Sequence, residues 1–146
     1  MAGVSIRPAR TDDAAAVAGL IGQLGYSTTA DDVVSRLPAM ESVGADAIVA
    51  EVDGTVVGCL TMSVMRVLHR PAPVGRISMM VVDQAHRSRG VGEKLVRAAE
   101  QALAARQCYM VEVTSRFELM RAHGFYERLG YERTSVRLAR LLDPTS

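Results

Sequence analysis

Residues 87–92 read Arg-Ser-Arg-Gly-Val-Gly, a basic and glycine-rich stretch that is suited to binding a phosphate group. An apolar run, residues 77–82, precedes the stretch, and a helical pattern, residues 93–106, follows it. Glycines let backbone N–H groups approach an anion closely, and the first turn of a helix presents unpaired N–H groups to it. Arginine adds donors that match phosphate oxygens. The candidate anion-binding residues are Arg87, Ser88, Arg89, Gly90, Val91 and Gly92.

Two familiar nucleotide-binding loops fit this stretch poorly. A Walker loop continues with Lys and then Ser or Thr after its last glycine, whereas Gly92 is followed by Glu93, so no hydroxyl is placed to hold magnesium. A dinucleotide fingerprint requires a third glycine where this chain has Leu95. It also requires an acidic residue about twenty positions later. Glu112 has that spacing but lies inside an apolar run. The sequence therefore favours a different phosphate ligand.

The stretch matches the pattern Arg/Gln-x-x-Gly-x-Gly/Ala and resembles the GNAT acyltransferase superfamily, whose corresponding loop holds the pyrophosphate of coenzyme A. Residues 122–131, Ala-His-Gly-Phe-Tyr-Glu-Arg-Leu-Gly-Tyr, resemble the family's Ala-x-x-Phe-Tyr-x-x-x-Gly-Phe/Tyr segment. One motif alone is also compatible with an ordinary basic turn of an α/β domain. Two motifs in the family's order and spacing are more specific, and the resemblance extends over nearly the whole chain.

The resemblance implies an N-acetyltransferase that moves the acetyl group of acetyl-CoA to a primary amine of a small molecule or protein. The amine attacks directly in a ternary complex, so much of the catalysis is positioning. Backbone N–H groups at Met80, Val81 and Val82 would contact the cofactor and stabilise the oxyanion. Tyr126 matches the family's general acid, which protonates the leaving thiolate. Tyr126 could instead only pack against or orient the sulfur.

The general base is not assigned by the motifs. An amine with a pKa near about 10.4 must lose a proton before it attacks. Family members often carry a carboxylate on the fourth strand, but residues 77–80 read Ile-Ser-Met-Met. Glu112 on the next predicted strand and His69 in the loop before the fourth strand are the candidate bases. The alternatives are a structural strand carboxylate for Glu112 and an exposed loop residue for His69.

A few further positions bear on the two substrates. The family's pantetheine-contacting Asn is replaced by Leu119, so backbone groups, Thr114 or Ser115 would take over that contact. Tyr26 is a candidate contact for the acceptor and an equally good candidate for simple packing. The acidic residues of segment 26–46 would suit a cationic acceptor, although two of them are explained equally well by a helix start. These acidic residues are Asp31, Asp32, Glu41 and Asp46.

The hydrophobic pattern predicts the order β-α-α-β-β-β-α-β-α-β, an α/β fold with a mixed sheet of about six to seven strands and about four helices. Thr11 is expected to cap the first helix, and Pro38 to end the second. Asp53-Gly54 predicts a tight hairpin turn, and residues 131–142 are expected to contain the last strand. The whole chain, residues 1–146, is expected to form one domain.

Composition limits the class of protein. The chain has 146 residues, 49% hydrophobic residues, 23% charged residues and a net charge of +1. Such a chain is globular, and its charge argues against broad nucleic-acid binding. No apolar run reaches membrane-spanning length and residues 1–10 lack a secretory apolar region, so a cytoplasmic protein is expected. The two cysteines, Cys59 and Cys108, are expected in the core, and no Cys/His cluster predicts a metal.

Some functional alternatives stay open on sequence alone. A homodimer is an expectation from the family resemblance. The missing strand carboxylate also fits a non-catalytic, coenzyme A-binding sensor or regulatory module, whereas an intact Tyr126 favours an enzyme. A structural interaction domain without a ligand is the third possibility.

Overall fold

The computed structural model describes residues 3–114 and 120–143. The chain divides into two compact units, residues 1–114 and 115–146. The first unit contains a five-stranded sheet in the order β1-β2-β3-β4-β5. Neighbouring strands are antiparallel except for the parallel pair β4 and β5, so the predicted mixed sheet is confirmed. The strands are β1 (Val4–Pro8), β2 (Ala45–Val52), β3 (Thr55–Met65), β4 (Val74–Val82) and β5 (Met110–Val113).

The number of strands is lower than predicted, because the described residues form five strands rather than six or seven. Residues 131–142 lie in no strand, which corrects the expectation of a last strand there. Val136 and Leu138, two apolar residues of this range, are exposed at 86% and 90%. An alternating apolar pattern favours a strand only where its apolar side packs against a neighbour.

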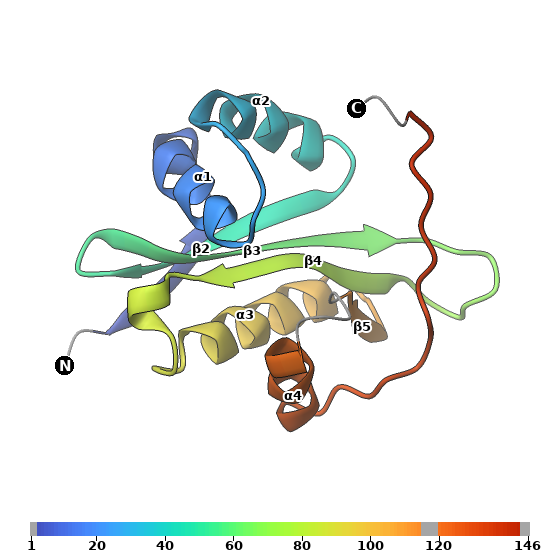
Figure 1. Ribbon diagram of the computed structural model, residues 1–146. Coiled ribbons are helices and arrows are strands. Elements are labelled where there is room, and N and C mark those ends of the chain that lie inside the picture. Colours follow the sequence, from blue (N-terminus) through green and yellow to red (C-terminus); the bar gives the residue numbers. More distant parts are fainter. Residues whose placement is uncertain (1–2, 115–119, 144–146) are drawn as a thin grey trace. The chain divides into compact units, whose positions relative to one another are not determined.

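Helices cover both faces of the sheet in the first unit (Figure 1). The helices α1 (Ala14–Gln23) and α2 (Ala30–Glu41) lie on one face, and α3 (Val91–Ala105) lies on the other. The core under α1 and α2 joins Val17, Leu20 and Val33 of the helices to side chains of three strands. Those strand residues are Val49, Cys59 and Val81.

Local rules explain the start of α2, but two other expected helix ends differ in the structure. The Thr29 side chain accepts from the N–H of Asp32 at 3.0 Å while Asp32 accepts from the N–H of Thr29 at 2.9 Å, so a reciprocal capping box begins α2. Thr11 does not cap α1, because a short 3₁₀ turn, Thr11–Asp13, precedes that helix. Pro38 does not end α2, which continues to Glu41. Proline removes the N–H that would bond the carbonyl of Val34, and the helix nevertheless continues for three more residues.

A buried ion pair connects β1 to the start of α1. Arg7 donates to both carboxylate oxygens of Asp13, at 2.8 and 2.9 Å, and Asp13 is only 6% exposed. The carboxylate also accepts from the N–H of Arg10 at 2.7 Å. The hydrogen bond from Arg7 is the largest cause that holds the pKa of Asp13 below its usual value, ahead of the bond from Arg10. The buried charge is therefore fully compensated, and it orients α1 on the sheet.

The helix α3 approaches the sheet so closely that two strand positions have no room for a side chain. A Cβ atom at Gly75 of β4 would lie 2.7 Å from a Leu103 methyl group and 3.0 Å from its Cγ atom. A Cβ atom at Gly58 of β3 would lie 3.0 Å from a Leu95 methyl group. Leu95 and Leu103 are fully buried, so these contacts hold α3 along its length.

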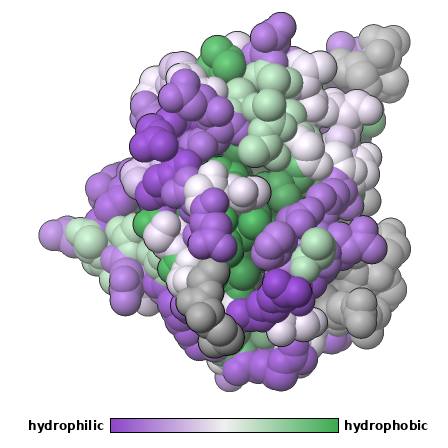
Figure 2. Space-filling model, turned by 90° about the vertical axis from the view of Figure 1, so that its left-hand side faces the viewer, coloured by the Kyte–Doolittle hydropathy of each residue, from purple (hydrophilic) through white to green (hydrophobic). Residues whose placement is uncertain are grey.

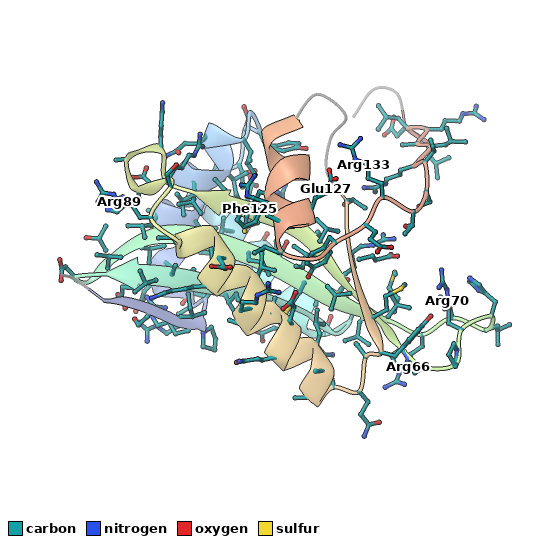
Figure 3. All side chains as sticks on the ribbon, turned by 90° about the horizontal axis from the view of Figure 1, so that it is seen from below. Arg66, Arg70, Arg89, Phe125, Glu127 and Arg133 are labelled. Atoms are coloured by element: carbon teal, nitrogen blue, oxygen red, sulfur yellow. The ribbon has the colours of Figure 1, made fainter. Side chains whose placement is uncertain are left out.

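The second unit contains α4 (Met120–Arg128), which overlaps the second family motif, residues 122–131. Gly130 has a φ of +101°, the left-handed conformation typical of the residue that ends a helix. The N–H groups of Leu129 and Tyr131 both donate to the carbonyl of Tyr126, at 3.0 Å each. Arg133 pairs with Glu127 at 3.0 Å just beyond the helix (Figure 3).

The close approach of α3 yields a stability prediction. Gly75→Ala should lower the free energy of unfolding by about 1–3 kcal/mol, because the new methyl group overlaps a packed leucine. Gly19→Ala is the matched control on the exposed side of α1, where an added Cβ meets nothing within 4 Å. The control should be neutral or stabilising by up to about 1 kcal/mol. Urea unfolding measures both, and equal effects would contradict the close approach.

Candidate active site

The strand β4 separates from β5 in the middle of its length. The last paired residues are Ile77 of β4 and Val113 of β5. The pairing of β4 with β3 shifts at the same place, because Ile77 faces Met62 while Met79 faces Thr61. Ser78 is thus the extra residue of a β-bulge, which bends a strand and redirects its side chains. Residues 78–82 consequently keep β3 as a neighbour and have no pairing with β5.

The amide directions of this separated segment follow from the ladder. Asp83 donates its N–H to the carbonyl of Val57 at 2.7 Å, and antiparallel residues alternate between bonding toward a partner strand and away from it. The N–H groups of Met80 and Val82 therefore face away from β3, on the side that β5 has left. The N–H of Val81 faces β3. The sequence predicted that Met80, Val81 and Val82 all contact the cofactor. The alternation of amide directions favours Met80 and Val82.

The predicted anion-binding loop lies between β4 and α3. Gly90 has a φ of +81° and directly precedes α3, whose first backbone bond runs from the N–H of Lys94 to the carbonyl of Gly90 at 3.1 Å. The N–H groups of Val91, Gly92 and Glu93 precede that bond and so lack intrahelical partners. Ser88 also has a positive φ, +65°, so the loop turns sharply before the helix.

The two arginines of the loop differ in their placement. The Nε–H of Arg87 donates to the Val82 carbonyl at 3.0 Å, which holds the loop against the end of β4. Arg89 is exposed and extends away from the sheet (Figure 3). Figure 2 views the molecule from the side on which this loop lies and shows mostly hydrophilic side chains around a band of apolar surface. An anion at the loop would meet N–H groups and at least one arginine.

A polar network that no motif signals fixes the start of this loop. Gln23, at the end of α1, donates to Asp83 at 2.8 Å and accepts from the N–H of Gln84 at 3.0 Å. His86 contacts the other oxygen of Asp83 at 3.0 Å. The hydrogen bond from Gln23 is the largest cause that lowers the pKa of Asp83, followed by the bond with His86. Because Gln23 is some sixty residues distant in sequence, spacing could not have revealed this support.

A row of polar side chains crosses three strands beside the point of separation. Ser63 of β3 faces Arg76 of β4, which in turn faces Glu112 of β5. The Ser78 hydroxyl lies 2.7 Å from that of Thr61. Gly75 faces α3, so Arg76 and its neighbours in the row belong to the opposite face, the one that carries α1 and α2. We call Thr61, Ser63, Arg76, Ser78 and Glu112 the polar ledge.

The two candidate bases differ in their surroundings. Glu112 accepts from Arg76 at 3.1 Å (Nε) and 2.7 Å (Nη2), and both contacts use the same oxygen, Oε1. His69 is exposed in the loop between β3 and β4, beside Arg70, which donates to the Tyr109 hydroxyl at 3.1 Å. Sequence reasoning found Glu112 but missed its four ledge neighbours, because only strand register aligns them.

The acidic residues of segment 26–46 have structural roles. Asp32 belongs to the capping box of α2, and Asp31 lies in the same first turn. Asp46 pairs with Arg106 at 2.8 Å. These contacts weaken the hint of a cationic acceptor. Tyr26 is 54% exposed in the loop between α1 and α2, which leaves it accessible to an acceptor.

Tyr126 is buried in α4, at 9% exposure. Its ring makes edge-to-face contacts with Phe125 and Tyr131, at centroid distances of 5.1 and 5.7 Å. Burial raises the pKa of Tyr126 to about 12. The phenol therefore keeps its proton at neutral pH, as a proton donor must. Ser115 and Leu119, which the sequence placed near pantetheine, lie outside the described residues.

Other chemistries find less support in the described residues. Burial is also the main cause that raises the pKa of the Cys59 thiol to about 12, so its nucleophilic thiolate is disfavoured and the predicted core role fits. Within residues 3–114 and 120–143, no group of three His, Cys, Asp or Glu side chains could hold a metal ion. No helix in these ranges is long and apolar enough to cross a membrane.

Comparison with known proteins agrees with this geometry. The model of the acetyltransferase (GNAT) family matches residues 24–131. Glucosamine 6-phosphate N-acetyltransferase 1 of Oryza sativa subsp. japonica is 30% identical over 127 residues, which cover 82% of this chain and 75% of the relative. Aminoalkylphosphonate N-acetyltransferase of Salmonella typhimurium is 28% identical over 90 residues, 62% of this chain and 58% of the relative.

A solved structure supports the same fold. The aminoglycoside N-acetyltransferase AAC(6′)-Iy in complex with CoA has a TM-score of 0.86 at 20% sequence identity, with 98% of this chain and 97% of that chain covered. The chain therefore belongs to the GNAT acetyltransferase family, and it is an N-acetyltransferase. The predicted family and fold class are confirmed, apart from the strand number.

The loop geometry predicts how cofactor binding can be removed. Gly90→Asp should abolish CoA binding measured by calorimetry, because it places a carboxylate among N–H groups that would hold a pyrophosphate. Gly54→Asp is the matched control, since Gly54 in the β2–β3 turn has a similar φ of +78° and equally open surroundings. The control shares the backbone strain and should still bind CoA. Undiminished binding by Gly90→Asp would contradict the pyrophosphate site.

Proposed function

We propose that the chain transfers the acetyl group of acetyl-CoA to a primary amine, with the pyrophosphate on residues 87–92 and the thioester beside the separated segment of β4. The observation that carries the proposal is the separation of β4 from β5 immediately before the anion-binding loop. One strand thereby offers free amides to a carbonyl and leads into a helix N-terminus suited to a phosphate. The family membership supports the same assignment.

The proposal treats residues 1–146 as one catalytic domain. The match to the family model, residues 24–131, includes both the β4–α3 loop of the first unit and Tyr126 of the second. This continuity supports a shared function for the two units. A homodimer stays a prediction from the family resemblance, and a cytoplasmic location stays a prediction from the pattern of apolar residues.

In the proposed reaction, the neutral amine attacks the thioester carbonyl, the C–N bond forms and the C–S bond breaks. The N–H groups of Met80 and Val82 stabilise the oxyanion while charge develops on it. Tyr126 donates its proton to the departing thiolate. Its raised pKa of about 12 means that the donor is fully protonated but transfers its proton less readily than an unperturbed phenol. A donor role therefore requires the thiolate to come close to the hydroxyl.

Glu112 has better support than His69 as the proposed base. Its Oε1 atom takes both hydrogen bonds from Arg76, so Oε2 has no protein donor among the contacts recorded for the described residues. That oxygen can accept a proton from an ammonium group, directly or through water. The alternative role of Glu112 is purely structural, as the partner of Arg76. His69 would act from an exposed loop.

The two curated relatives support a small amine as the acceptor. By their names they act on glucosamine 6-phosphate and on aminoalkylphosphonates. Both are amines that also carry a phosphorus oxyanion, whereas the structural neighbour acts on aminoglycosides. These names suggest the first amines for an assay.

The acid role predicts the effect of removing one hydroxyl. Tyr126→Phe should lower kcat by about 10²–10⁴-fold, the usual contribution of a general acid, while CoA binding is retained. Tyr131→Phe is the matched control in the same aromatic cluster and should change kcat little. Single-turnover kinetics, which isolate the chemical step, provide the measurement. An unchanged chemical rate in Tyr126→Phe would rule out the acid role and leave packing.

The base role is tested by a parallel pair of variants. Glu112→Gln should lower kcat/KM by about 10²-fold or more, because the amide takes no proton. His69→Gln should leave kcat/KM nearly unchanged. The reverse pattern would assign the base to His69. Unchanged values of kcat/KM in both variants would mean that water takes the proton without either residue.

A further inference from the structure

We propose that the Arg76–Glu112 pair selects acceptors that carry a phosphate or phosphonate group together with the reactive amine. The inference rests on the proposed function for the use of the polar ledge as the acceptor site. The pair would bind both charged groups of such a molecule, the ammonium at Glu112 and the phosphorus oxyanion at Arg76.

The hydrogen bonds of the pair leave the complementary edge of each partner available. Arg76 donates its Nε hydrogen and one Nη2 hydrogen to a single oxygen of Glu112. A guanidinium has five N–H donors, and the edge formed by Nη1 and the second Nη2 hydrogen matches two oxygens of a phosphate. No contact of Nη1 or of Glu112 Oε2 is recorded in the described part of the chain. The side chains of both residues are 34% exposed, so a ligand can reach them.

The position of the pair connects it to the reaction centre. Arg76 lies two residues before the bulge at Ser78, and Glu112 lies one residue before Val113, the last β5 residue that pairs with β4. An amine at Glu112 is therefore beside the place where β4 loses its second neighbour and exposes its amides. The Ser63 hydroxyl, directly across from Arg76, adds a neutral donor for the same anion.

The charges around the ledge favour an anion over a polycation. The loop before β4 contributes Arg66 and Arg70, which lie at one end of the sheet, whereas Arg89 lies at the other end (Figure 3). On the ledge itself, Glu112 is the acidic residue and it is already paired with Arg76. The nearest candidates for a cationic pocket in the sequence, Asp32 and Asp46, are used in a helix cap and in a pair with Arg106.

The experiment compares acceptors that differ only in the anion. For glucosamine 6-phosphate and glucosamine, the ratio of their kcat/KM values should be at least about tenfold in the wild type, which is the size expected of a charged hydrogen bond. The ratio should approach one in Arg76→Gln and be partly retained in Arg76→Lys, which keeps the charge but loses the fork. Arg97→Gln, on α3, is the control and should keep the wild-type ratio. A ratio within one variant is insensitive to a general loss of activity.

Three results would overturn the proposal: a wild-type ratio near one, a preference for spermidine over every anionic amine, or a ratio that Arg76→Gln leaves unchanged. β-Alanine, which carries a carboxylate, and 2-aminoethylphosphonate complete the panel. Similar efficiency with both would also contradict the specific preference for a phosphorus oxyanion.

Failure of the proposed function gives a different result. In that case calorimetry detects CoA binding, or none, but no amine in the panel is acetylated. The anion site is then decided by binding alone. 2-Aminoethylphosphonate should raise the melting temperature of the wild-type protein in the presence of CoA and should not raise that of Arg76→Gln. The absence of a shift in the wild type, or equal shifts in both, would overturn the inference.

Discussion

The close approach of α3 to the sheet is the constraint on which the arrangement of the site depends. Gly75 and Gly58 leave no side chain between the strands and the helix, so Leu103 and Leu95 contact the sheet directly. Interiors are packed densely enough that a helix seated in this way has little freedom to shift. The first turn of α3 is thereby held at the end of β4, and the anion-binding N–H groups take their position from packing far along the same helix.

The β-bulge at Ser78 is a second constraint on the site. A single extra residue changes which side chains of β4 lie on each face of the sheet. Without it, strict alternation would place residues 76, 78, 80 and 82 on one face of β4. With it, Arg76 and Ser78 contribute to the polar ledge, while Val81 joins the core under α1 and α2. The same irregularity coincides with the loss of pairing to β5. The sheet thus opens beside the proposed thioester site, and polar side chains lie next to that opening.

The sequence predicted those parts of the molecule that depend on local chemistry. The loop 87–92 and the turn at Asp53-Gly54, with φ values of +50° and +78°, follow from the conformations that particular residues favour. The parts it missed depend on distant partners. Strand register aligns Ser63, Arg76 and Glu112, and tertiary packing brings Gln23 to Asp83. Likewise, residues 131–142 form no strand, because strand propensity alone supplies no neighbouring strand.

The energetics of the Arg76–Glu112 pair bear on why it occurs at this place. An ion pair with about a third of each side chain in water contributes roughly 0–1 kcal/mol to stability, since desolvation and lost side-chain freedom offset most of the attraction. The pair at Arg7 and Asp13 is different, because its buried carboxylate needs its partners in order to remain ionised. Stability therefore explains the geometry of the buried pair far better than that of the exposed one. An exposed arginine that uses one edge on a carboxylate and leaves its other donors to a ligand fits the proposed role in recognition. Because its removal costs the fold little, a change of acceptor preference in such a variant reports on the site itself.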